Sequence, residues 1–263
     1  KILTLTAFII LLFFAFHSQN FRLDASSDTL ILQNDKNFKY FNYYNNIFPT
    51  KNFLVLAIKS EKIIDIDYIN QIKIIKNKLE KIEGIESIFS ITDAPILLLN
   101  DLKLTDLANK EIQTLDNSQI DLNKALNELS RSPIFHNQII NTDKTVSSMI
   151  IYLKKNDDFY KIKKQKEHYS KLTAQEDITN YNNLEKKYRE LKTINTKNRN
   201  NLIQDIRDTL INENISYEYF LGGIDMIVDD TLRFIKNDII VFSISVLIFI
   251  FIVLFFIFKN IKW

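Results

Sequence analysis

The sequence of 263 residues contains no cysteine, only three glycines and three prolines, and a single tryptophan. Without cysteine the chain forms no disulfide bond and no cysteine-ligated metal site. The scarcity of glycine and proline means that few turns are forced along the chain. Hydrophobic residues make up 46% of the sequence, which is enough apolar material for a folded domain with a core.

A charge excess of one sign is also missing, since 34 Lys and Arg residues stand against 32 Asp and Glu residues. Such a balance argues against a nucleic-acid partner. The chain has no glycine-rich phosphate loop, and its three histidines, His17, His136 and His168, lack the spacing of metal ligands. No nucleophile–base pair is recognisable either. We therefore expect a protein that is not an enzyme and that holds neither a metal nor a cofactor.

Two long apolar runs lie at the ends of the chain. Residues 239–258 contain no charge and only Ser243 and Ser245 as polar residues, and about 20 such residues cross a bilayer. A buried core helix is the alternative, but soluble helices seldom remain apolar all round for so long. We expect a transmembrane helix at 239–258, preceded by a juxtamembrane helix at 224–238.

The first apolar run, residues 2–16, is shorter and includes two threonines. Its length also suits the core of a signal peptide, but the residues after it offer no small-x-small cleavage site. We expect an uncleaved transmembrane helix within residues 1–17. Because the sequence begins with Lys1, its natural start is expected further upstream, and residues 259–263 are expected to open a segment that continues.

The lysines outside the two runs predict the topology. Lys1 precedes the first run, while Lys259 and Lys262 follow the second. The positive-inside rule then places both outer ends in the cytoplasm and residues 18–238 outside the inner (plasma) membrane. The sequence thus predicts a multi-pass membrane protein with the lipid bilayer as a partner.

The outer segment opens with an aromatic helix and a β-α-β unit. Asp35 is a helix N-cap, and Pro49 ends a helix whose aromatic residues are expected to form a packing face, with a ligand face as the alternative. Residues 53–59 read as a buried strand, and isoleucines at helical spacing follow over 66–82. Gly84 ends that helix, and residues 85–91 alternate as a half-buried strand does.

A second unit follows. Ser118 and Asp121 stand in capping-box positions before a leucine-faced helix, and residues 137–153 predict a hairpin with its turn at 142–144. A helix over 196–213 then leads to a strand over 215–223.

Two β-α-β units in series predict an α+β, ferredoxin-like domain. Residues 158–195 carry two further apolar stripes and predict a helical insert, a pair of antiparallel helices joined near 173–177.

Two stretches resemble the resistance–nodulation–division superfamily, and most closely its MMPL-type branch. They are LEKIEGIESIFSITDAPIL (79–97) and the segment that runs from GGIDMIVDD (222–230) to FIFKN (256–260). The family has a Gly-Val pair and a Ser-Leu turn at the positions of Gly84–Ile85 and Ser90–Ile91. Its second membrane helix ends in a basic triplet, and the corresponding residues here are 258–260.

The resemblance implies a proton-driven exporter of lipids or other hydrophobic molecules. The chain would supply a porter-type extracytoplasmic domain flanked by two transmembrane helices, while the proton-relay acids lie in a later helix. An ionisable side chain within a membrane helix would mark such a proton-relay site, and residues 239–258 contain none. The implied partners are the rest of the same transporter, a hydrophobic cargo and further copies of the chain.

The junction before the last apolar run is our candidate for motion coupling. Gly222 and Gly223 are predicted to form a hinge, and residues 224–258 a stiff rod of roughly 50 Å. Asp229 and Arg233 lie one helical turn apart and are expected to pair.

A two-helix sensor receptor shares this layout and is the alternative. In a sensor, a long helix would continue from the first membrane segment, whereas the polar residues of 24–34 interrupt that continuity. The sequence therefore favours the exporter.

Overall fold

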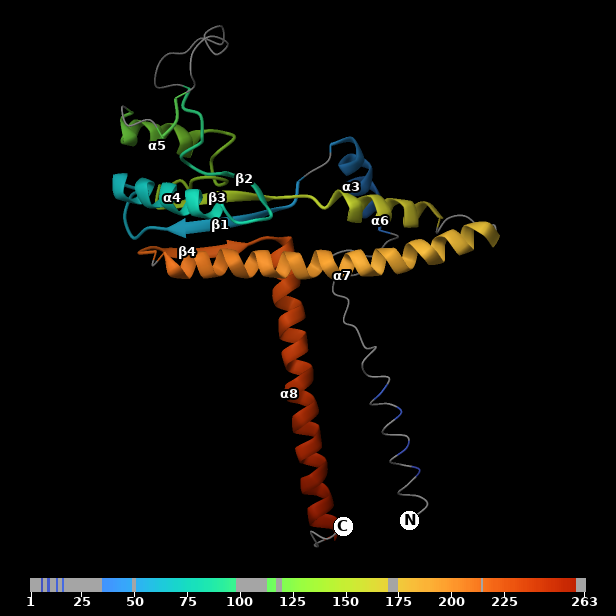
Figure 1. Cartoon of the computed structure of the whole chain (residues 1–263). Helices are drawn as coiled ribbons and strands as arrows, with labels where there is room; N and C mark the ends of the chain where they lie inside the picture. The colour runs from blue at the N-terminus through green and yellow to red at the C-terminus, as the bar shows by residue number, and fades with distance from the viewer. Residues whose placement is uncertain are drawn as a thin grey trace. The chain divides into compact units, whose positions relative to one another are not determined.

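The computed structural model describes residues 35–48, 51–97, 113–116, 120–169, 175–213 and 215–258, together with Thr6, Ile9, Phe13 and Phe16. The described chain is a mixed α and β protein with a four-stranded antiparallel sheet and one long apolar helix (Figure 1). This confirms the predicted combination of helices and strands. The chain divides into two units, residues 48–227 and residues 1–47 with 228–263.

The sheet belongs to the unit 48–227. Its strands are β1 (Phe53–Lys59), β2 (Ile85–Phe89), β3 (Val146–Leu153) and β4 (Glu218–Gly222). They lie in the order β2-β3-β1-β4, and all neighbours are antiparallel. Since β1 and β2 both oppose β3, they run in the same direction, and β3 and β4 run in the other. Each of these same-direction pairs is connected through a helical segment.

Helix α4 (Ile66–Leu79) connects β1 to β2. Asp65 is its N-cap and accepts a hydrogen bond from the Tyr68 N–H at 2.9 Å. Of the isoleucines that predicted the helix, Ile69, Ile72 and Ile75 are buried with the strand leucines in one core, whereas Ile66 is exposed. The helix ends at Leu79, earlier than predicted, because a turn follows that leads to Gly84 at φ +100°.

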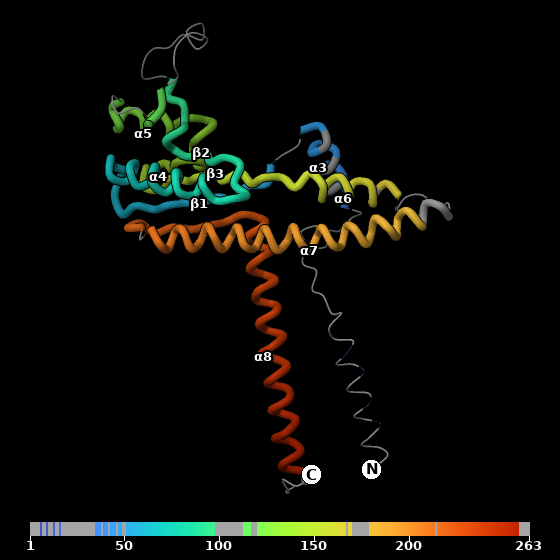
Figure 2. The backbone as a smooth tube through the Cα atoms, in the orientation of Figure 1, coloured from blue at the N-terminus to red at the C-terminus, as the bar shows by residue number. Residues whose placement is uncertain are grey.

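Helices α6 (Asp157–Tyr169) and α7 (Gln175–Asn212) connect β3 to β4, and α6 lies beside α7 (Figure 2). The prediction of a separate helix at 196–213 is wrong, since α7 is continuous over 38 residues. Nothing interrupts it, because residues 175–212 contain neither glycine nor proline. Its last turns bury Leu202, Ile203, Ile206 and Leu210 in the core.

Helix α5 (Leu122–Arg131) has Asp121 as its N-cap, while Ser118 lies outside the described residues. The predicted hairpin is only partly present. Its second arm is β3, but residues 137–140 make isolated bridges instead of a strand. The Asn141 side chain occupies the turn and accepts hydrogen bonds from the N–H groups of Thr145 and Val146.

The other unit includes α3 (Lys36–Ile47) and most of α8 (Ile224–Phe258). Asp35 caps α3 as predicted, and Pro49 lies outside the described residues. Among the residues that the structure describes, α8 is the one helix long and apolar enough to cross a membrane, and its side chains from 239 to 257 are all exposed. The predicted first membrane segment, 1–17, lies outside the described residues except at four positions.

Candidate functional site

The predicted coupling site is the point where the sheet passes into α8. Gly222 is the last residue of β4 and lies opposite Val55 of β1. One residue, Gly223, separates it from the start of α8 at Ile224. The Gly223 carbonyl accepts a hydrogen bond from the Ile227 N–H at 3.0 Å and so begins the helix. The edge strand β4 is thereby joined to α8 without a loop.

The two glycines of this junction differ in what surrounds them. Gly223 has φ +139°, and a Cβ built there would lie 2.8 Å from Leu54 Cδ2 and 3.1 Å from the Phe53 carbonyl oxygen. At Gly222 the nearest such atom, the Val55 carbonyl oxygen, is 4.0 Å away. Only Gly223 therefore requires glycine, because its backbone lies directly against β1.

An ion pair connects α7 to the first turn of α8. Arg199 Nε of α7 lies 3.4 Å from Asp225 Oδ2, and both side chains are largely buried. Asp225 also stands where the partial positive charge of a helix N-terminus favours an acid. The sequence did not indicate this pair, since residues 26 positions apart on different helices share no local pattern.

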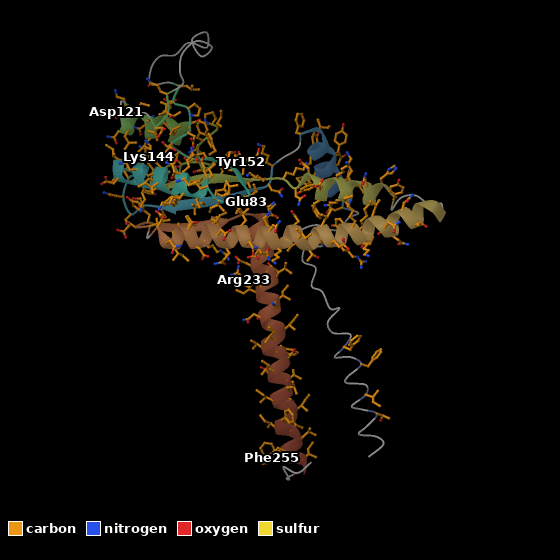
Figure 3. The ribbon with its side chains drawn as sticks, in the orientation of Figure 1. Glu83, Asp121, Lys144, Tyr152, Arg233 and Phe255 are labelled. Atoms are coloured by element: carbon orange, nitrogen blue, oxygen red, sulfur yellow. The ribbon has the colours of Figure 1, made fainter. Side chains whose placement is uncertain are left out.

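One turn further along α8, Arg233 pairs with two acids. Its Nη2 donates a hydrogen bond to Asp229 Oδ2 at 2.7 Å and lies 3.5 Å from Asp230 Oδ1. Asp229 is buried, whereas Arg233, labelled in Figure 3, is half exposed. The predicted Asp229–Arg233 pairing is thus present. Its role in coupling stays a prediction.

A polar cluster closes the turn after β2. The Ser90 N–H and hydroxyl both donate to Asp93 Oδ2 at 2.9 Å, and Lys76 of α4 pairs with the other oxygen of this carboxylate. Ser90 and Thr92 are buried and hydrogen-bonded to each other. The contacts hold the turn on α4, so they assign the Ser90–Ile91 motif a structural role.

Tyr68 is a fully buried tyrosine in the core of the sheet unit. Its hydroxyl donates to the Ile58 carbonyl at 2.8 Å and lies 2.8 Å from Ser147 Oγ. Burial raises the pKa of Tyr68 to about 12, which outweighs the opposite effect of the Ser147 hydrogen bond. The phenol therefore stays neutral at ordinary pH and ties α4 to β1 and β3.

A third cluster lies between α6 and α7. Glu185 pairs with Lys166 at 2.5 Å and with Arg189 at 2.7 Å, and Lys166 stands 4.3 Å from the Tyr188 ring centroid. Burial raises the pKa of Glu185, but the hydrogen bonds and positive charge of Lys166 and Arg189 outweigh it, so this pKa lies below its usual value. Phe159 stacks on Tyr188 beside the cluster.

The histidines are apart from one another. His136 Nδ1 lies 2.8 Å from the Ser130 carbonyl, His168 contacts the ring of Tyr169, and His17 is not among the described residues. Within the described ranges, no three His, Cys, Asp or Glu side chains gather as a metal site would require.

No protein-family model and no curated protein matches this chain. The resemblance to the exporter superfamily therefore depends on the quoted motifs and the layout alone.

Proposed function

We propose that the chain is the N-terminal portion of a resistance–nodulation–division exporter of the MMPL type, which moves lipids or other hydrophobic molecules with proton energy. In this proposal residues 18–223 form the porter-type domain outside the inner membrane, and residues 1–17 and 239–258 cross it. The main observation in support is that β4, an edge strand of the β2-β3-β1-β4 sheet, is followed after a single residue by the long apolar helix α8.

The strand order supports a ferredoxin-like domain. That fold consists of two β-α-β units whose strands make one antiparallel sheet. Here β1-α4-β2 is the first unit and β3-α6-α7-β4 is the second, with the helix pair standing where the fold has one helix. We therefore treat α6 and the first half of α7 as the insert, residues 158–195.

The junction supports a coupling role. A continuous helix of 35 residues transmits displacement well, because its backbone hydrogen bonds are all internal. Gly223 packs against β1 and Asp225 pairs with Arg199, so the start of α8 follows any movement of this part of the sheet domain. At Gly222 an added Cβ makes only an ordinary van der Waals contact with the Val55 carbonyl oxygen, so the flexibility of the junction can be changed there without displacing a neighbour.

The proposed test is transport by cells that carry the complete gene. We expect efflux of the lipophilic dye Nile red that a protonophore abolishes and that deletion of the gene removes. Gly222→Val should lower efflux without changing the amount of protein in the membrane, because valine restricts the backbone while its Cβ makes only an ordinary contact with β1. Gly222→Ala, a milder change at the same position, is the matched control.

Unchanged dye efflux and unchanged surface lipids after gene deletion would contradict the exporter proposal. A deletion that instead abolishes the response of a target gene to an external ligand would establish the sensor alternative.

A further inference from the structure

The described aromatic side chains of helix α3 are exposed, although the sequence predicted that they form a packing face. The exposed fractions are 55% for Tyr40, 59% for Phe41, 61% for Tyr43 and 59% for Tyr44. The phenylalanines that predicted a packing face include Phe41 and Phe48, and both are exposed, so the prediction is wrong for these two side chains. Aromatic residues exposed at this density mark an interaction surface.

The exposed residues are ordered on the helix. Lys36, Tyr40, Tyr43, Tyr44 and Ile47 follow one another at intervals of four, three, one and three residues, which places them on one face. We call Lys36, Lys39, Tyr40, Tyr43, Tyr44 and Ile47 the α3 surface. Its aromatic rings also contact each other, with Tyr43 and Tyr44 meeting edge to face at 5.6 Å.

The charge of this helix has one sign. Lys36 and Lys39 lie within α3, which contains no acid, while Asp35 is engaged at the N-terminus as the cap. A hollow of about 440 Å³ is lined, among the described residues, by Lys36, Lys39, Tyr40 and Tyr43. The surface of this hollow is almost entirely apolar. The positive charge that attracts an anion therefore lies on the ammonium groups of Lys36 and Lys39, while the rings of α3 offer apolar surface.

We propose that the α3 surface binds the anionic phospholipid head groups of a bilayer, so that α3 lies in the membrane–water interface. Tyrosine suits this region because its ring is apolar and its hydroxyl is wet. Lysine is attracted there by the negative surface potential of anionic lipids. The same chain carries α8, whose uniformly apolar and exposed residues from 239 onward call for a bilayer.

The absence of native cysteine allows a direct test on the full chain. Asn37→Cys places one thiol on the exposed side of α3 without removing any residue of the α3 surface. The labelled protein, carrying an environment-sensitive fluorophore, is incorporated into nanodiscs of phosphatidylcholine, alone or mixed in equal parts with phosphatidylglycerol. Lipids with a nitroxide near the head group then report contact by quenching. Asn198→Cys, an exposed position on α7, is the control label site.

We expect stronger quenching at position 37 than at 198, and stronger quenching with phosphatidylglycerol than without it. Adding Lys36→Gln and Lys39→Gln should weaken the surface association about 30-fold, since each lysine near an anionic surface contributes roughly fivefold. The pair Lys36→Arg and Lys39→Arg keeps the charge and should retain quenching. Co-elution with the nanodisc reports insertion of the apolar helix separately.

Three outcomes would overturn the proposal. They are no quenching at position 37, equal quenching at 37 and 198, or quenching that ignores both the anionic lipid and the glutamine substitutions. Protection of the label by a second copy of the chain, without lipid quenching, would assign the α3 surface to a protein interface instead.

Discussion

Two constraints act on Gly223: its backbone has a left-handed conformation, and it lies directly against the neighbouring strand β1. An added methyl group meets Leu54 Cδ2 at 2.8 Å as well as backbone atoms of β1, which are unable to move aside cheaply. We expect Gly223→Ala to lower the free energy of unfolding by about 2–4 kcal/mol, from backbone strain together with overpacking. Thermal unfolding of the full chain in detergent micelles measures this loss.

Gly222→Ala is the matched control, since its Cβ meets nothing closer than 4.0 Å. It should change stability by less than about 1 kcal/mol. Equal losses at the two positions would contradict the distinction. The same comparison matters for the hinge, because only a change at Gly222 alters flexibility without damaging the contact with β1.

Tyr68 predicts how stability depends on alkaline pH. The pKa of about 12 in the folded chain exceeds the ordinary value of 10.0, so the phenolate is favoured in the unfolded chain. The contribution is fully present below about pH 10 and is lost as pH rises towards 12, by up to roughly 3 kcal/mol. Tyr68→Phe should remove this part of the decline and, through the lost hydrogen bonds, cost about 1–2 kcal/mol near neutral pH.

Denaturant unfolding at neutral and alkaline pH tests this expectation. Tyr219→Phe, which removes the hydroxyl of a half-buried tyrosine on β4, is the control for the loss of a tyrosine hydroxyl as such. An equally steep decline in Tyr68→Phe would show that other groups dominate the alkaline transition.

The negative charge of Glu185 on α7 joins this helix to α6 through its ion pair with Lys166. The pKa of Glu185 is lowered, so its stabilisation is present above the ordinary value of 4.5 and is lost as pH falls through the folded value. We expect the helix pair to loosen as acid protonates this carboxylate, at a pH below its ordinary pKa of 4.5. Glu185→Gln should loosen it at all pH values, because glutamine leaves Lys166 and Arg189 without a counter-charge.

Spin labels at Gln165→Cys and Lys187→Cys, both exposed, report the distance between the two helices. The distance distribution should be narrow at neutral pH and broad in acid. Glu190→Gln, an exposed change on α7, is the control and should behave as the parent. A distribution that stays narrow at both pH values, and in Glu185→Gln, would exclude the carboxylate as the joining group.

Several elements follow from local sequence pattern. The strand β1 has the bounds 53–59 that its apolar run predicts, and α8 begins directly after Gly223 and reaches Phe258. Asp35, Asp65 and Asp121 are helix caps because their short acceptor side chains reach nearby N–H groups. In each case the determining interactions lie within a few residues.

Other features depend on contacts that no local pattern records. The continuity of α7 was missed because its apolar stripe changes neighbour, from α6 in its first half to the sheet core around Ile206. The pair Arg199–Asp225 joins two helices, and the difference between Gly222 and Gly223 arises from β1. Exposure of Tyr43 and its neighbours on α3 is likewise a property of tertiary structure, since an aromatic stripe alone does not say what covers it.

At the scale of the whole molecule, α8 makes the membrane expectation quantitative. All residues of 239–258 except Ser243 and Ser245 are Ile, Val, Leu or Phe, which together favour insertion by about −5 to −11 kcal/mol. One arginine at the helix centre costs only about 3 kcal/mol. Ile248→Arg alone should therefore still insert, whereas arginine at all four positions from Leu247 to Ile250 should not.

An epitope placed after Trp263 reports the outcome in spheroplasts treated with protease. If α8 crosses the membrane, the tag is protected in the parent chain and in Ile248→Arg, while the sheet domain is cleaved. In the four-arginine variant α8 remains outside, and the tag becomes accessible although the rest of the chain is unchanged. Protection in all three variants would mean that the predicted topology is wrong at this end. Cleavage of both the tag and the sheet domain in the parent would mean that α8 does not cross the bilayer, whereas cleavage of the tag alone would mean that it crosses in the opposite orientation.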